Sequence, residues 1–125
     1  MRVLTLLKMR ESGLGEPPAE LFTAMDATIK EIDATMTIVD TNGLLPSGVA
    51  GTKIVSTGGR STVLDGPFTE SRELVGGYAI VECDTYQDAV EAARKIIDVH
   101  EKFWPGWEGE AEVRQIMGQD EMPGG

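Results

Sequence analysis

Few side chains in this sequence are suited to proton transfer. His100 is the single histidine among 125 residues, and an imidazole with an ordinary pKa of about 6.5 exchanges a proton readily at neutral pH. Asp65 opens an Asp-Gly-Pro-Phe turn, whose glycine and proline would hold the carboxylate in a fixed direction. We therefore expect Asp65 and His100 as candidate catalytic residues. Each also has a purely structural interpretation, Asp65 as part of a stiff turn and His100 as a favourable group near a helix C-terminus.

A second group of side chains could line a site for a small molecule. These candidate ligand-binding residues are Phe68, Glu70, Arg72, Tyr78 and Arg114. Aromatic rings provide apolar walls, a tyrosine hydroxyl can bond a ligand, and an arginine can hold a carboxylate. Alternatively, the loop charges are simply solvated, the tyrosine belongs to the core, and the arginine pairs with Glu82 or Glu112 on neighbouring strands.

The sequence shows no pattern for a cofactor or a metal ion. One histidine and one cysteine provide no ligand spacing, and neither a Walker loop nor a G-x-G-x-x-G motif occurs. The single cysteine, Cys83, excludes an intrachain disulfide. Because Cys83 alternates with Val81 on one strand face, we expect it to be buried and unreactive. No cofactor is expected.

The charge balance restricts the partners. Eleven Lys and Arg against 21 Asp and Glu give a formal charge of −10, which argues against nucleic acid and against anionic membranes. The charge either keeps the protein soluble or presents an acidic surface to a basic protein partner. No signal-peptide pattern and no membrane-length apolar stretch is present. We expect a cytoplasmic protein.

Hydrophobic periodicity predicts the elements that must position these side chains. Strands are expected at 3–7, 78–83 and 113–117. Another strand begins at 37–39 and is broken at 42–43 and 46–48, and 51–55 with 62–64 form a hairpin. A helical stripe runs from Leu21 to Met36, after a loop that ends in two prolines. A second stripe runs from Ala89 to Phe103, with Thr85 as its cap. The run at 3–7 is typical of a central strand buried on both faces.

This order of elements predicts an α+β fold. It is the ferredoxin-like β-α-β-β-α-β plan with an extra hairpin, in which helices cover one face of an antiparallel sheet. Residues 1–118 would form one domain, followed by a mobile acidic tail at 119–125. Because the chain offers no third layer, we expect a second copy to cover the other face and form a homodimer.

One motif points to a family. The sequence Asp-Gly-Pro-Phe-Thr-Glu at 65–70, with Leu-Val-Gly-Gly-Tyr at 74–78, resembles the signature of the DGPF proteins, a branch of the YCII-related family. Residues 3–7 and 112–114 resemble the family's first and last strands. The resemblance implies a dimeric α/β barrel with a cleft between helices and sheet in each subunit. YCII-type relatives carry a His–Asp pair whose histidine follows the first strand, but residues 8–20 contain no histidine.

Three functional hypotheses remain open at this point. The first is a small-molecule-binding protein, which as an enzyme would be a cofactor-free isomerase, lyase or hydrolase that uses Asp65 and His100 in acid–base roles. The second is a non-catalytic regulatory module. It is favoured by the acidic surface and by the resemblance, since some DGPF members are encoded beside sigma factors. The third is a dimer in which the Asp-Gly-Pro-Phe turn is purely architectural.

Overall fold

A computed structural model describes residues 1–10, 13–68, 74–118 and 121 of the chain. The elements in chain order are β1 (Arg2–Met9), α1 (Ala19–Asp33), β2 (Thr37–Gly43), α2 (Ser47–Ala50), β3 (Thr52–Thr57), β4 (Arg60–Asp65), β5 (Leu74–Glu82), α3 (Tyr86–Phe103) and β6 (Gly109–Gln115). Glu70, Arg72 and most of the predicted tail lie outside the described residues.

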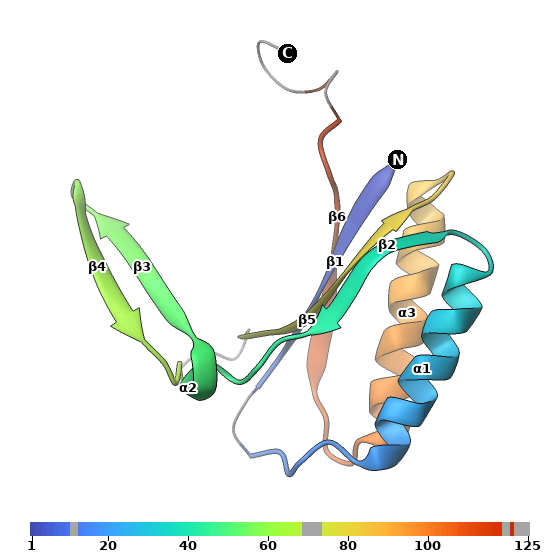
Figure 1. Ribbon diagram of the computed structural model, residues 1–125, viewed down its shortest axis with the longest axis horizontal. Helices are drawn as coiled ribbons and strands as arrows, with labels where there is room; N and C mark the ends of the chain where they lie inside the picture. The colour runs from blue at the N-terminus through green and yellow to red at the C-terminus, as the bar shows by residue number, and fades with distance from the viewer. Residues whose placement is uncertain (11–12, 69–73, 119–120, 122–125) are drawn as a thin grey trace.

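Four strands form the main sheet in the order β2-β5-β1-β6, and every neighbouring pair is antiparallel. The second, third, first and fourth strands of the β-α-β-β-α-β plan thus lie side by side, which is the ferredoxin-like arrangement. The helices α1 and α3 pack on one face of this sheet (Figure 1). The predicted α+β fold with an antiparallel sheet is confirmed.

The two faces of the central strand β1 differ in burial. Val3 is fully buried and Thr5 is 6% exposed on the helix side, where Val3 packs with Val81, Cys83 and Ala89. Leu4 and Leu6 alternate with them and are only half-buried, because no element of the described chain covers that face. The prediction of a central strand is confirmed, but burial on both faces is wrong within one chain. We call this face the uncovered face.

Local sequence explains where the two long helices begin. Pro18 precedes the first residue of α1, and its carbonyl accepts a bond from the Leu21 amide. Thr85 caps α3 as predicted: its hydroxyl accepts the Asp88 amide at 3.2 Å, and the Asp88 carboxylate accepts the Thr85 amide at 3.3 Å. The helix ends at Phe103, directly before the predicted Trp-Pro-Gly stop. This geometry places His100 in the last turn of α3.

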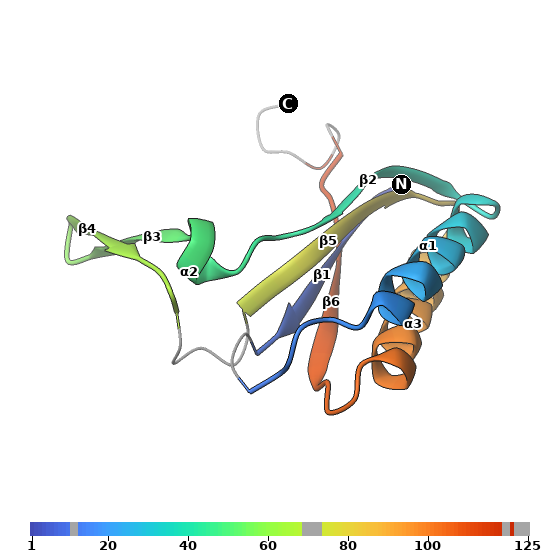
Figure 2. The same ribbon diagram turned by 60° about the horizontal axis from the view of Figure 1, so that its bottom comes forward.

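The predicted hairpin is present, but it stands apart from the main sheet. Strands β3 and β4 pair only with each other, and Gly58 and Gly59 take the positive φ values that their tight turn requires. The short helix α2 replaces the irregular break predicted at Pro46–Gly48. We call residues 52–65 the arm. The arm and the two long helices lie on opposite sides of the main sheet (Figures 1 and 2).

Candidate functional site

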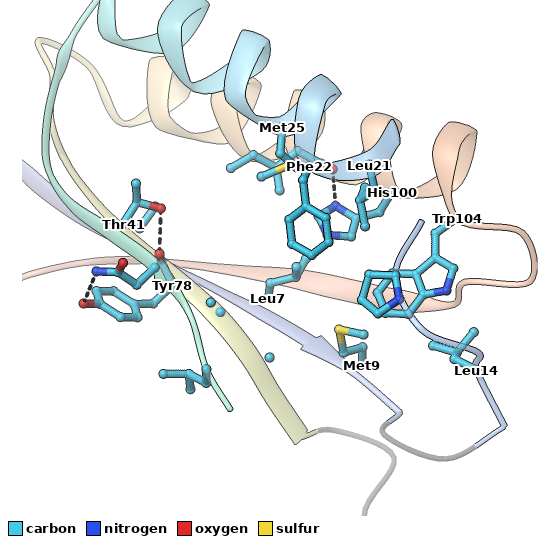
Figure 3. Close-up of a pocket in the computed structure, with 18 of the residues that line it drawn as sticks. Leu7, Met9, Leu14, Leu21, Phe22, Met25, Thr41, Tyr78, His100 and Trp104 are labelled. Atoms are coloured by element: carbon cyan, nitrogen blue, oxygen red, sulfur yellow. Dashed lines mark hydrogen bonds between the residues drawn. The ribbon is translucent and has the colours of Figure 1, made fainter. Parts of the chain in front are cut away.

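A pocket of about 940 Å³ lies between the helices α1 and α3 and the main sheet. On the sheet it is bordered by the C-terminal parts of β1 and β2 and the N-terminal part of β5. Its walls are mainly apolar and aromatic. The apolar side chains that line it are Leu7, Met9, Leu14, Leu21, Phe22, Met25, Ile29, Leu44, Ile96 and Trp104. Figure 3 shows Leu7, Met9, Leu21, Phe22 and Trp104 around a common space, with His100 among them. Its size and lining are those of a site for a small organic molecule.

Two buried polar residues, Thr5 and His100, line this pocket, and His100 is the titratable one. The residue is 6% exposed, and its Nδ1 lies 2.8 Å from the carbonyl oxygen of Ile96, one turn earlier on α3. A carbonyl oxygen can only accept, so Nδ1 carries the proton of this bond. In the neutral ring the lone pair is then on Nε2. No partner for Nε2 occurs among the described residues.

The protonation state of His100 follows from its surroundings. Burial lowers the pKa of His100 below its ordinary value of 6.5, and the bond to the Ile96 carbonyl opposes this shift only in part. The ring is therefore neutral at pH 7. A neutral imidazole with a defined Nδ1–H tautomer offers Nε2 as a hydrogen-bond acceptor or as a base.

One tryptophan contacts the ring of His100, and a second lines the pocket. The Trp107 indole lies against the imidazole with ring centroids 5.0 Å apart and planes inclined by 43°. Trp104 lines the pocket, and both tryptophans are buried in a cluster with Leu21. The structure places them in the core, with Trp104 at the pocket wall.

Charged side chains also border the pocket. Arg10, Glu16 and Asp26 line it and are all exposed, and the Asp26 carboxylate is 3.4 Å from Lys30 Nζ. They belong to the loop after β1 and to the solvent side of α1. The pocket therefore combines apolar walls and the neutral, buried imidazole of His100 with charged groups that remain in contact with water.

Asp65 and Phe68 lie at the root of the arm and are not among the residues that line the pocket. Asp65 is exposed and accepts a hydrogen bond from the Thr52 hydroxyl at 3.1 Å across the hairpin. The half-buried Phe68 lies under Lys53, whose Nζ is 4.3 Å from the ring centroid. The structure thus does not bring Asp65 and His100 to one cavity.

Tyr78 and Arg114 belong mainly to the uncovered face. Tyr78 borders the pocket, but Figure 3 shows its ring on the other side of the strand from His100. Its hydroxyl donates to Asp40 at 2.6 Å. Arg114 does not line the pocket and lies 3.3 Å from Glu112, one of the two partners considered for it. Glu70 and Arg72 fall outside the described residues.

Sequence reasoning missed most of the pocket wall. Leu14 and Arg10 lie in a polar, glycine-containing segment that carries no periodic signal. Thr41 precedes the break expected at 42–43, but no feature of the sequence marks it as a pocket residue; β2 extends to Gly43 and brings Thr41 to the pocket. The signal that was available is the helical stripe, since Leu21, Met25 and Ile29 all line the pocket.

A four-stranded antiparallel sheet, two helices on one face and a pocket between the layers define a small α+β domain of ferredoxin-like topology. Residues 1–104 match the family model of the YCII-related domain, and the chain belongs to the YCII-related family. A search of curated proteins found no match. Among the described residues, no helix has the length and apolar character needed to cross a bilayer.

Proposed function

We propose that this protein binds a small, largely apolar molecule in the pocket and that His100 Nε2 accepts a proton or a hydrogen bond from it. The observation that carries the proposal is a buried, neutral imidazole whose Nδ1 is bonded to the Ile96 carbonyl at 2.8 Å within an apolar pocket. Nε2 has no hydrogen-bond partner among the described residues, so its lone pair is available to a ligand that donates a hydrogen bond.

The lining supports a particular ligand chemistry. Walls of Leu, Met, Phe and Trp favour a ring or a branched aliphatic group. The neutral acceptor, His100 Nε2, favours a ligand that places a hydroxyl, an amide N–H or a weakly acidic C–H beside it. The exposed guanidinium of Arg10 at the pocket would suit a polar or anionic group that stays close to water.

The same geometry suits cofactor-free proton transfer. A neutral histidine whose pKa is lowered by burial acts as an acceptor at pH 7 rather than as an acid. Proton abstraction by such a base is the first step of many isomerisations and eliminations. We propose His100 for this role without Asp65, because Asp65 is hydrogen-bonded to Thr52 on the arm and does not line the pocket.

The Asp-Gly-Pro-Phe sequence at 65–68 supports the finer proposal that the chain belongs to the DGPF branch of its family. Its place at the root of the arm favours an architectural role. Gly66 donates its amide to the Gly51 carbonyl at 2.8 Å, and the Phe68 amide donates to the Ser47 hydroxyl at 2.9 Å.

Phenol and toluene provide a matched pair of probes, since they have nearly the same shape and only phenol carries a donor. Their affinities can be measured by the fluorescence of Trp104 and Trp107, the two tryptophans of the chain. The comparison is the phenol-to-toluene affinity ratio in the wild type and in His100→Phe. The phenylalanine ring keeps the contact with Trp107 and removes both nitrogens.

We expect the ratio to fall roughly fivefold in His100→Phe, as the loss of one hydrogen bond worth about 1 kcal/mol requires. Toluene affinity should change little. An equal ratio in both proteins would show that Nε2 does not contact the ligand. Failure of the folded wild type to bind either probe at millimolar concentration would contradict the pocket assignment itself.

A further inference from the structure

The second buried polar side chain of the pocket, Thr5, belongs to the sheet. It is 6% exposed and lies on the helix side of the central strand β1. Along that side it comes between Val3, which is fully buried, and Leu7, which lines the pocket. Strand β1 is paired with β5 on one edge and with β6 on the other. The sheet therefore holds Thr5 in a fixed position at the pocket wall.

The hydroxyl of Thr5 has no hydrogen-bond partner among the described residues. Its cross-strand neighbours are Ala79 on β5 and Val113 on β6, and neither side chain can form a hydrogen bond. In the same part of the chain, the buried side-chain atom that lacks a partner and is closed off from solvent is Trp107 Nε1. The Thr5 hydroxyl is not closed off in this way, so it opens onto the pocket that Thr5 lines.

The other buried hydroxyl side chains in the described part of the chain are bonded within the fold. Thr28 donates to the carbonyl oxygen of Ala24 at 2.9 Å, one turn earlier on α1. The Ser47 hydroxyl accepts the Phe68 amide at 2.9 Å. Neither of these two residues lines the pocket. Thr5 thus differs from both, because its buried hydroxyl is available to a molecule in the pocket.

We propose that the Thr5 hydroxyl is the second polar contact for the ligand and determines which ligands the pocket prefers. The inference rests on the proposed function, in which His100 Nε2 accepts a hydrogen bond from the same ligand. Thr5 belongs to the sheet and His100 to α3. A ligand bonded to both residues therefore joins the two layers that enclose the pocket.

The chemistry of the two contacts defines the ligand class. With its proton on Nδ1, the imidazole of His100 can only accept at Nε2, whereas a threonine hydroxyl can both donate and accept. The group beside His100 is then a donor, and the group beside Thr5 is a hydroxyl or a carbonyl oxygen. The preferred ligand is a small ring or branched aliphatic molecule that carries two such groups.

Dihydroxybenzenes compared with methylphenols isolate the second contact. The pairs are catechol with 2-methylphenol, resorcinol with 3-methylphenol and hydroquinone with 4-methylphenol. In each pair one hydroxyl is kept and the other is replaced by a methyl group of similar size. The three pairs cover three separations between the two groups. NMR titration of the backbone amides gives the dihydroxybenzene-to-methylphenol affinity ratio of each pair.

Three variants make the comparison specific. Thr5→Val removes the hydroxyl with little change of shape, and Thr5→Ser keeps it. Thr28→Val is the matched control, because it makes the same substitution at a buried threonine that does not line the pocket. Circular dichroism shows whether each variant is folded.

We expect the affinity ratio of at least one pair to fall about fivefold in Thr5→Val, the effect of losing one hydrogen bond. The same ratio should stay within about twofold of the wild type in Thr5→Ser and in Thr28→Val. Ratios that are equal in the wild type and in Thr5→Val for all three pairs would overturn the inference. An equal fall in Thr28→Val would overturn it as well.

The phenol-to-toluene comparison in His100→Phe separates this inference from the proposed function. If that comparison gives the expected result and Thr5→Val leaves every ratio unchanged, the role of Thr5 alone is contradicted. If the folded wild type binds none of the probes at millimolar concentration, both proposals fail.

A measurement on the wild type covers the case in which Thr5→Val does not fold. In protein saturated with the tightest-binding dihydroxybenzene, nuclear Overhauser cross-peaks report which side chains contact the ligand. We expect cross-peaks from the ligand ring protons to the Thr5 methyl group and to the imidazole of His100. A spectrum of the saturated protein without a cross-peak to the Thr5 methyl group would overturn the inference.

Discussion

The imidazole of His100 lies against the indole of Trp107 with their centroids 5.0 Å apart. This contact joins the last turn of α3 to the segment that follows it and closes one end of the helix–sheet interface. It also brings the candidate base into contact with a fluorescent side chain.

The stability of the protein should depend on pH through His100. In the unfolded chain this histidine has its ordinary pKa of 6.5, and burial lowers the pKa in the folded protein. As the pH falls below 6.5, the unfolded chain binds a proton that the folded protein does not yet bind, so the free energy of unfolding decreases. Above that pH the group has no effect.

Urea unfolding of the wild type and of His100→Phe between about pH 7 and pH 5.5 measures this contribution. We expect the free energy of unfolding to fall more steeply with acid in the wild type than in the variant. Equal slopes in the two proteins would mean that His100 is not buried in its neutral form.

Tyr78 should not contribute its hydroxyl to ligand binding. The hydroxyl donates to Asp40 at 2.6 Å, and the ring lies on the other side of the strand from His100 (Figure 3). We expect Tyr78→Phe to leave phenol affinity within about twofold of the wild type and to cost about 1 kcal/mol of stability or less. A loss of phenol affinity similar to that of His100→Phe would place the hydroxyl in the site.

The cap of α3 should contribute measurably to stability, since this helix positions His100. Thr85 and Asp88 satisfy each other's backbone amides at 3.2 Å and 3.3 Å. We expect Thr85→Ala to lower the free energy of unfolding by about 0.5–2 kcal/mol, with Thr85→Ser as a conservative control that retains most of it. Thermal unfolding followed by circular dichroism gives the values. An unchanged midpoint in Thr85→Ala would show that the cap is not formed in solution.

Local patterns predicted the secondary structure well because the elements are strongly periodic. The stripe predicted from Leu21 to Met36 forms α1 only as far as Asp33, three residues short of Met36, while the cap at Thr85 lies where the sequence indicated. The order of strands follows from connectivity, since two β-α-β units have few arrangements. The separation of the arm from the main sheet was not predictable, because the pairing Thr52↔Asp65 satisfies the hairpin pattern in either position.

The site was only partly predictable for a related reason. His100 stood out as the single histidine on a helical stripe, and the structure places it at the pocket. Asp65 stood out through its turn motif, but a turn motif specifies local backbone and not the surface that the turn meets. The partners of His100, such as Trp107 and the Ile96 carbonyl, depend on how α3 and its following loop pack against the rest of the domain.

The most direct test of the proposed site is a long-range ¹H–¹⁵N spectrum of His100 at pH 7, recorded without and with saturating phenol. The structure leads us to expect a neutral ring protonated on Nδ1, and a shift of the Nε2 resonance when phenol donates to it. A ring protonated on Nε2, or an Nε2 resonance that does not move in phenol-saturated protein, would contradict the account.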